Sequence, residues 1–78
     1  MIKKENKLVI TFYTTTEAMA MEQVCKSASA PGRLIPVPRS ISAGCGLAWC
    51  ADVECEEELR KIIEIHQITP QQIQICLV

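Results

Sequence analysis

The order of apolar and polar residues predicts a strand and then a helix near the start of the chain. Residues 7–13 alternate around large apolar side chains with β-branched partners, which is typical of a strand. Thr14 and Glu17 have the spacing of a capping box, so we expect a helix to begin there. Residues 30–32, Ala-Pro-Gly, are expected to end it. Helical period gives this predicted helix a buried face made of Ala18, Met21, Cys25 and Ala28.

Two prolines mark the second predicted strand, residues 33–41. Pro36 and Pro38 are two positions apart, so their missing N–H groups lie on the same side of the strand. A central strand would lose two hydrogen bonds there, whereas an edge strand loses none if that side faces solvent. The prolines therefore predict that this strand lies at an edge of the sheet.

Residues 46–51 predict a third strand, with its odd-numbered residues on one face and its even-numbered residues, including Cys50, on the other. Asp52 can cap a second helix, whose first turn is rich in glutamate, as the helix dipole favours. Its inner face is expected to consist of Cys55, Leu59, Ile62, Ile63 and His66. After a turn at residues 68–70, a last strand would place Ile73, Ile75 and Leu77 on one face.

The element order β-α-β-β-α-β predicts an α+β protein in one domain that spans residues 1–78. For so short a chain we expect a ferredoxin-like two-layer sandwich with an antiparallel sheet of order 4-1-3-2. Both helices would then cover one face of the sheet. The other face would be apolar enough to bind a partner or to form a homodimer, and would carry Val9, Thr11 and Tyr13, with Cys50 and Cys76 as further candidates.

Composition excludes several classes of function. Hydrophobic residues make up 49% of the 78 residues, which suits a folded core. The net charge of -1 gives no basic surface for nucleic acid. No run approaches the ~20 apolar residues of a membrane span, and the start of the chain lacks the apolar stretch of a secretion signal. We therefore expect a cytoplasmic protein that binds neither nucleic acid nor membranes.

The five cysteines favour free thiols over a disulfide framework. Their number is odd and no Cys-x-x-Cys occurs, which also disfavours a thioredoxin-type redox pair. Cys45, Cys50 and Cys55 are five residues apart, and five residues of strand span ~16 Å, too far to share one metal ion. We expect no metal and no cofactor. The single histidine, His66, is expected beside the last carbonyls of the second helix.

The triplet Gly44-Cys45-Gly46 is the candidate for thiol chemistry. Glycine neighbours leave room around a sulfur atom, although most such triplets are only tight turns. In the predicted topology this connection lies at the same end of the sheet as Thr15 and Thr16, where the first helix begins. A helix N-terminus and a nearby cation, here Arg39, both lower the pKa of a thiol. Cys45 is therefore the candidate reactive residue.

Two parts of the chain resemble a known family. The run from residue 35 to residue 48, with its pattern Pro-x-Pro-Arg…Cys-Gly, is similar to the central signature of a family of small bacterial selenium/sulfur (Se/S) carrier protein-like proteins. Residues 10–12 and 15–22 resemble that family's first strand and helix. The resemblance implies a carrier cysteine that falls on Cys45, preceded by Arg39 and Ser42. The Cys-Pro-x-Pro motif of better-established sulfur carriers is absent.

Two classes of function stay open at this point. In the first, Cys45 relays sulfur or selenium as a persulfide or perselenide between a donor protein and an acceptor protein, as a carrier or accessory protein rather than a stand-alone enzyme. Gly44 and Gly46 would keep its sulfur accessible. In the second, the chain is a non-catalytic ferredoxin-like module for protein interaction or regulation, and the triplet is a turn. The reactivity of each thiol at neutral pH would separate the two. Sequence does not choose between sulfur and selenium, nor decide whether Cys50 or Cys76 takes part.

Overall fold

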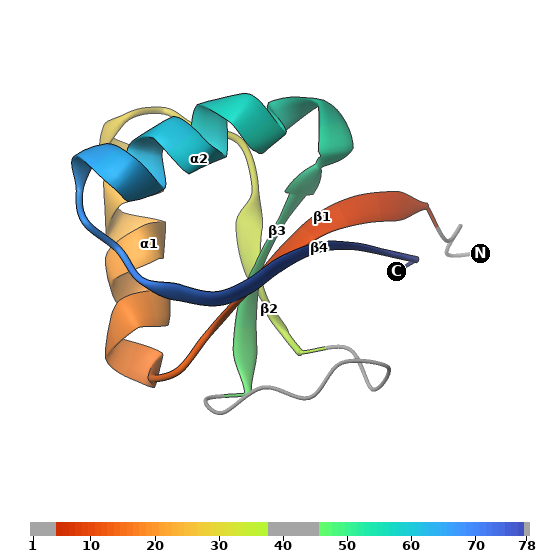
Figure 1. Ribbon diagram of the computed structural model, residues 1–78, viewed down its shortest axis with the longest axis horizontal. Helices are drawn as coiled ribbons and strands as arrows, with labels where there is room; N and C mark the ends of the chain where they lie inside the picture. The colour runs from red at the N-terminus through yellow and green to blue at the C-terminus, as the bar shows by residue number, and fades with distance from the viewer. Residues whose placement is uncertain (1–4, 38–45, 78) are drawn as a thin grey trace.

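A computed structural model describes residues 5–37 and 46–77 of the chain. Figure 1 shows two helices packed against a twisted sheet. The elements are β1 (Asn6–Phe12), α1 (Thr15–Ser27), β2 (Arg33–Pro36), β3 (Leu47–Asp52), the 3₁₀ helix η1 (Val53–Cys55), α2 (Glu56–Ile65) and β4 (Pro70–Leu77). The predicted α+β class and element order are confirmed, with the short η1 as an addition.

The four strands form one antiparallel sheet of order β2-β3-β1-β4. This is the predicted order 4-1-3-2 counted from the other edge, so the second strand lies at an edge, as its prolines predict. The backbone N–H of Val37 donates to the carbonyl oxygen of Gly46 at 3.0 Å. Because N–H groups alternate along a strand, the nitrogen of Pro36 faces away from β3, where no ladder bond is lost. Pro38 lies outside the described residues.

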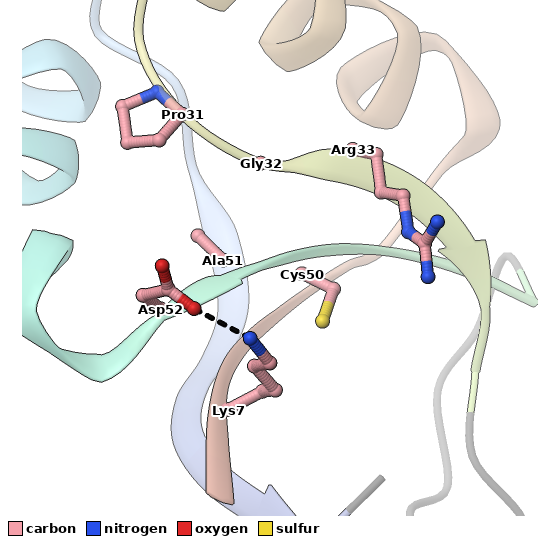
Figure 2. A pocket seen from close by; sticks show the side chains of 7 residues that line it. All are labelled: Lys7, Pro31, Gly32, Arg33, Cys50, Ala51 and Asp52. Carbon is pink, nitrogen blue, oxygen red and sulfur yellow. Dashed lines mark hydrogen bonds and ion pairs between the residues drawn. The ribbon is translucent and has the colours of Figure 1, made fainter. Parts of the chain in front are cut away.

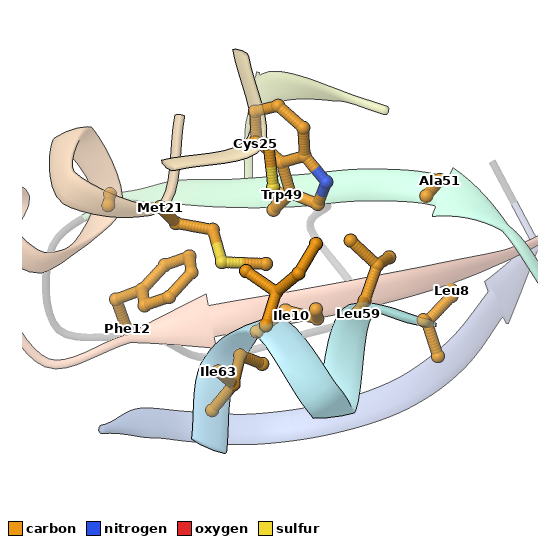
Figure 3. Packing of buried hydrophobic residues seen from close by; sticks show 11 residues of the cluster. Leu8, Ile10, Phe12, Met21, Cys25, Trp49, Ala51, Leu59 and Ile63 are labelled. Carbon is orange, nitrogen blue, oxygen red and sulfur yellow. The ribbon is translucent and has the colours of Figure 1, made fainter. Parts of the chain in front are cut away.

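The core lies between the helices and one face of the sheet (Figure 3). Because side chains alternate along a strand, every second residue of β1 and β3 points toward the helices. The helices contribute residues at helical spacing, including Cys25, which is fully buried as predicted. The cluster consists of Leu8, Ile10, Phe12, Ala18, Met21, Cys25, Trp49, Ala51, Leu59, Ile62 and Ile63. Full burial of one large aliphatic or aromatic side chain contributes about 1.5–3 kcal/mol, so this cluster supplies the main stabilisation.

Helix α1 begins as predicted but ends earlier. The Thr14 hydroxyl accepts a hydrogen bond from the Glu17 N–H at 3.2 Å, which confirms the cap. The helix then stops at Ser27, before the expected Ala-Pro-Gly stop, because Ser29 adopts a left-handed φ of 55°. The N–H of residue 30 returns to the Cys25 carbonyl at 2.8 Å, which closes the helix. Residue 28 is consequently an exposed cap and not part of the buried face.

The region around α2 departs from prediction at both of its ends. Asp52 precedes η1 without capping it through its side chain, and its carboxylate instead bonds to the amine of Lys7. Cys55 ends η1 and is only partly buried, though it packs against the core. His66 is the exposed C-terminal cap of α2 and does not belong to its buried face, because the helical stripe ends at Ile63.

The second face of the sheet is better covered than expected. Strand register places Val9, Thr11 and Ala48 together on this face, and all three have 0% exposure. Cys50 lies beside them at 9% exposure. Tyr13 is exposed but follows the end of β1 and is not part of the face. The expectation that Val9 and Thr11 form an exposed apolar surface is therefore wrong.

A tight contact joins the α1–β2 connection to β3. Gly32 has a φ of 119°, and a Cβ atom there would lie 2.4 Å from Nε1 of Trp49. The same indole nitrogen donates a hydrogen bond to the Pro31 carbonyl at 3.3 Å. Only glycine meets both the backbone and the space requirement, so this contact fixes the start of β2 against β3.

Candidate functional site

The predicted site is described only in part. Cys45, Arg39, Ser42 and Gly44 lie outside the described residues, so their predicted roles stay predictions. Gly46, Thr15 and Thr16, named as supporting residues, are all described and all exposed.

Gly46 follows the predicted carrier cysteine and leads directly into β3. Its φ is 76°, a left-handed value that side chains other than glycine adopt at a cost. Among the described residues, apart from its chain neighbour, none lies within 4 Å of a Cβ atom placed at this position. Glycine is therefore used here for its conformation and not to avoid a contact with another described residue.

The start of β3 and the start of α1 lie at the same end of the sheet. Thr11, near the end of β1, pairs with Ala48 at the beginning of β3. Helix α1 begins shortly after β1 ends, and Thr15 and Thr16 occupy its first two positions. The Thr14 hydroxyl satisfies the N–H of the third position, Glu17. The predicted topology of this end is therefore confirmed for the described residues.

The four described cysteines are all free thiols with a raised pKa. Burial, with a smaller effect of the Glu58 carboxylate, raises the pKa of Cys25 to about 11. For Cys50 burial outweighs the opposing effect of Lys7 and Arg33, so its pKa is also raised. Burial is likewise the main cause for Cys55 and Cys76. These four thiols are therefore mostly protonated at neutral pH, and each reacts more slowly than a thiol with an ordinary pKa.

No metal centre is formed by the side chains of residues 5–37 and 46–77. Among them, no group of three or more histidine, cysteine, aspartate or glutamate residues is placed to hold a metal ion. No described helix has both the length and the apolar character needed to cross a membrane.

A hollow that sequence reasoning missed lies between the end of β3 and the start of β2 (Figure 2). Its volume is about 300 Å³. It combines a thiol with three charged side chains, which come from β1, β2 and β3. Its lining consists of Lys7, Pro31, Gly32, Arg33, Cys50, Ala51 and Asp52. Arg33 and Cys50 become neighbours only through the register of β2 and β3, which residue spacing alone does not give.

The fold and the thiols define a small α+β protein whose four described cysteines are free and in which Gly46 leads into β3. The profile of a protein family described as "Putative Se/S carrier protein-like" matches residues 7–74. The chain belongs to this family, as its sequence resemblance indicates. Searches of curated proteins and of solved structures each found no match.

Proposed function

We propose that the protein is a sulfur or selenium carrier and that Cys45 holds the transferred atom as a persulfide or perselenide. Membership of the Se/S carrier-like family supports a carrier role. The observation that carries the choice of residue is the raised pKa of all four other thiols, because a carrier cysteine must react as a thiolate. Of the five cysteines, Cys45 is the one that this argument does not disfavour as the carrier residue.

Two features near Cys45 in sequence support the same choice. Gly46 is exposed, and a Cβ atom there would have no described neighbour within 4 Å beyond the adjoining residue, which supports access for a donor at this end of the molecule. The N-terminus of α1, with Thr15 and Thr16, lies at the same end of the sheet and favours negative charge. Arg39, Ser42 and Gly44 are proposed to complete the site, with the Arg39 guanidinium stabilising the thiolate.

The transfer step needs only a persulfide donor. The Cys45 thiolate attacks the terminal sulfur of a persulfide on the donor protein, and a new sulfur–sulfur bond forms at Cys45. The donor's own sulfur–sulfur bond breaks, and the donor thiolate leaves with the electron pair. An acceptor then removes the sulfur in a second transfer. Selenium would follow the same course through a perselenide.

We further propose that residues 1–78 form one ferredoxin-like domain that acts in the cytoplasm as a homodimer with a protein donor and a protein acceptor. The sheet order β2-β3-β1-β4 and the two helices support this fold. The alternative is a non-catalytic interaction module of the same fold, in which residues 44–46 are only a turn.

The test is persulfide loading by a cysteine desulfurase supplied with cysteine. We expect mass spectrometry to find one added sulfur on Cys45 of the full chain. Cys45→Ser should abolish the loading, whereas Cys55→Ser, which changes a thiol with a raised pKa, should leave it unchanged. A persulfide on Cys50 or Cys76 instead, or none under conditions that load a known carrier, would favour the interaction module.

A further inference from the structure

A thiol and a guanidinium lie side by side in the hollow between β2 and β3. Arg33 is the direct cross-strand partner of Cys50, so the two side chains leave the same face of the sheet with Cβ atoms about 5 Å apart. Cys50 is nine-tenths buried and lines the hollow of about 300 Å³, whereas Arg33 is exposed at its rim. Figure 2 shows the Cys50 sulfur between the side chains of Arg33 and Lys7.

Among the residues that the structure describes, the charges in the hollow leave the Arg33 guanidinium available to a ligand. The Lys7 amine bonds to the Asp52 carboxylate and lies 3.4 Å from a Glu5 carboxylate oxygen. Its charge is therefore already balanced. Among the described residues no carboxylate pairs with Arg33. A guanidinium presents paired N–H donors that match a carboxylate, so this rim favours an anionic ligand.

We propose that the hollow binds a small disulfide that carries a carboxylate, and that Cys50 exchanges with it to form a mixed disulfide. The ligand class combines the two chemistries present: a carboxylate for Arg33 and a sulfur electrophile for the thiol. This site goes beyond the proposed carrier function because it uses a different cysteine and a different reaction.

The exchange is balanced without any further reactant. Cys50 loses its proton to solvent, and its thiolate attacks one sulfur of the small disulfide. The new bond to Cys50 forms as the ligand's sulfur–sulfur bond breaks, and the leaving thiolate takes the electron pair and a proton from solvent. Cys50 is oxidised and the ligand is reduced. Burial raises the pKa of Cys50, so the exchange proceeds slowly through its minor thiolate form, which Lys7 and Arg33 stabilise.

The test compares three small disulfides of similar size that differ in charge. The compound 3,3′-dithiodipropionate is anionic, 2-hydroxyethyl disulfide is neutral and cystamine is cationic. Each is added to the reduced full-length chain at low ionic strength, and mass mapping follows the adduct on Cys50. Because the leaving thiols differ in pKa, each rate is divided by the rate for the same disulfide with urea-unfolded protein. We expect the normalised rate to be about two- to fivefold higher for the anionic than for the neutral compound, and lowest for the cationic one.

Two substitutions test whether Arg33 is the cause. Arg33→Ala should remove the preference for the anionic disulfide. Because Arg33 is exposed on an edge strand, the variant should fold, and circular dichroism checks this. Lys61→Ala removes an equal charge from the exposed side of α2 and should keep the preference. Cys45→Ser should also keep it, so the result is independent of the carrier proposal. Absence of a Cys50 adduct in the folded chain, equal normalised rates, or a preference that survives Arg33→Ala would each overturn the inference.

Discussion

Gly32 and Gly46 both have positive φ angles, yet their surroundings differ. At Gly32 a Cβ atom would collide with the Trp49 indole and would lie 2.8 Å from the Cys50 carbonyl oxygen. At Gly46 it would meet no described residue within 4 Å other than the adjoining one. One glycine therefore serves both packing and conformation, and the other serves conformation alone. The two positions form a matched pair for experiment.

Gly32→Ala is expected to destabilise the protein by roughly 2–4 kcal/mol, because backbone strain and overpacking add. Gly46→Ala should cost only roughly 1–2 kcal/mol, the strain of a left-handed alanine. Urea unfolding followed by circular dichroism measures both changes. Equal costs for the two substitutions would show that the contact between Gly32 and Trp49 can relax.

The Cys25 thiol is expected to make stability fall at alkaline pH. Its pKa is about 11 in the folded chain, against about 8.5 for a free cysteine. Between these values the unfolded chain binds fewer protons than the folded one, so the free energy of unfolding decreases as pH rises from about 8.5 to about 11. Cys25→Ala should show a smaller decrease in its urea midpoint between pH 7 and pH 10.5. An identical decrease in both proteins would contradict the prediction.

At the scale of elements, each helix is followed, two residues after its last one, by a residue other than glycine in the left-handed region. Ser29 has a φ of 55° after α1, and Gln67 has a φ of 54° after α2. In each case the N–H of the following residue returns to a carbonyl of the last turn: Ala30 to Cys25 at 2.8 Å and Ile68 to Ile63 at 3.0 Å. Glycine normally occupies such positions, so both ends carry avoidable strain.

Ser29→Gly is therefore expected to stabilise the protein by roughly 0.5–1 kcal/mol, since glycine adopts this φ without a steric penalty. The same substitution two positions earlier, Ser27→Gly, falls in the last turn of α1 and should destabilise by up to roughly 1 kcal/mol. Thermal unfolding of the two variants checks the opposite signs. A loss of stability in Ser29→Gly would rule out strain at this cap.

These helix ends also show which features of the fold can be predicted from residues that are close together in the sequence. The Thr14 cap, the element order and the edge position of β2 were predictable, because each rests on residues close together in the chain. The end of α1 was not, because Ser29 gives no glycine signal. The hollow was not predictable either, since Arg33 and Cys50 meet through strand register. The surroundings of Cys45 stay a prediction, with only its neighbour Gly46 described.

For the whole molecule, the outer edge of β4 is the surface most suited to a second copy of the chain. β4 runs from Pro70 to Leu77, and among the described strands only β1 pairs with it. It contains no charged residue, whereas exposed edge strands usually carry charges that prevent pairing. Ile75 on this strand is 53% exposed. Since Val9 and Thr11 are already covered, this edge is a better candidate for the expected dimer than the second sheet face.

We therefore expect sedimentation to show self-association at high micromolar concentration. Ile75→Lys should weaken it, because a lysine on each copy would introduce repulsion at a shared edge. Ile65→Lys places the same residue on α2, at a position 73% exposed, and should have no effect. A strict monomer, or equal weakening by both substitutions, would exclude association through β4.

The contact between Trp49 and the α1–β2 connection also gives the protein a built-in optical reporter. The chain has a single tryptophan, Trp49, and this residue is only 3% exposed. Its nitrogen bonds to Pro31 and its ring adjoins Gly32, and both residues line the hollow that contains Cys50. A ligand entering the hollow would change the polarity around the indole and shift its fluorescence emission. Binding in the hollow could thus be followed in the unlabelled protein by its intrinsic tryptophan fluorescence.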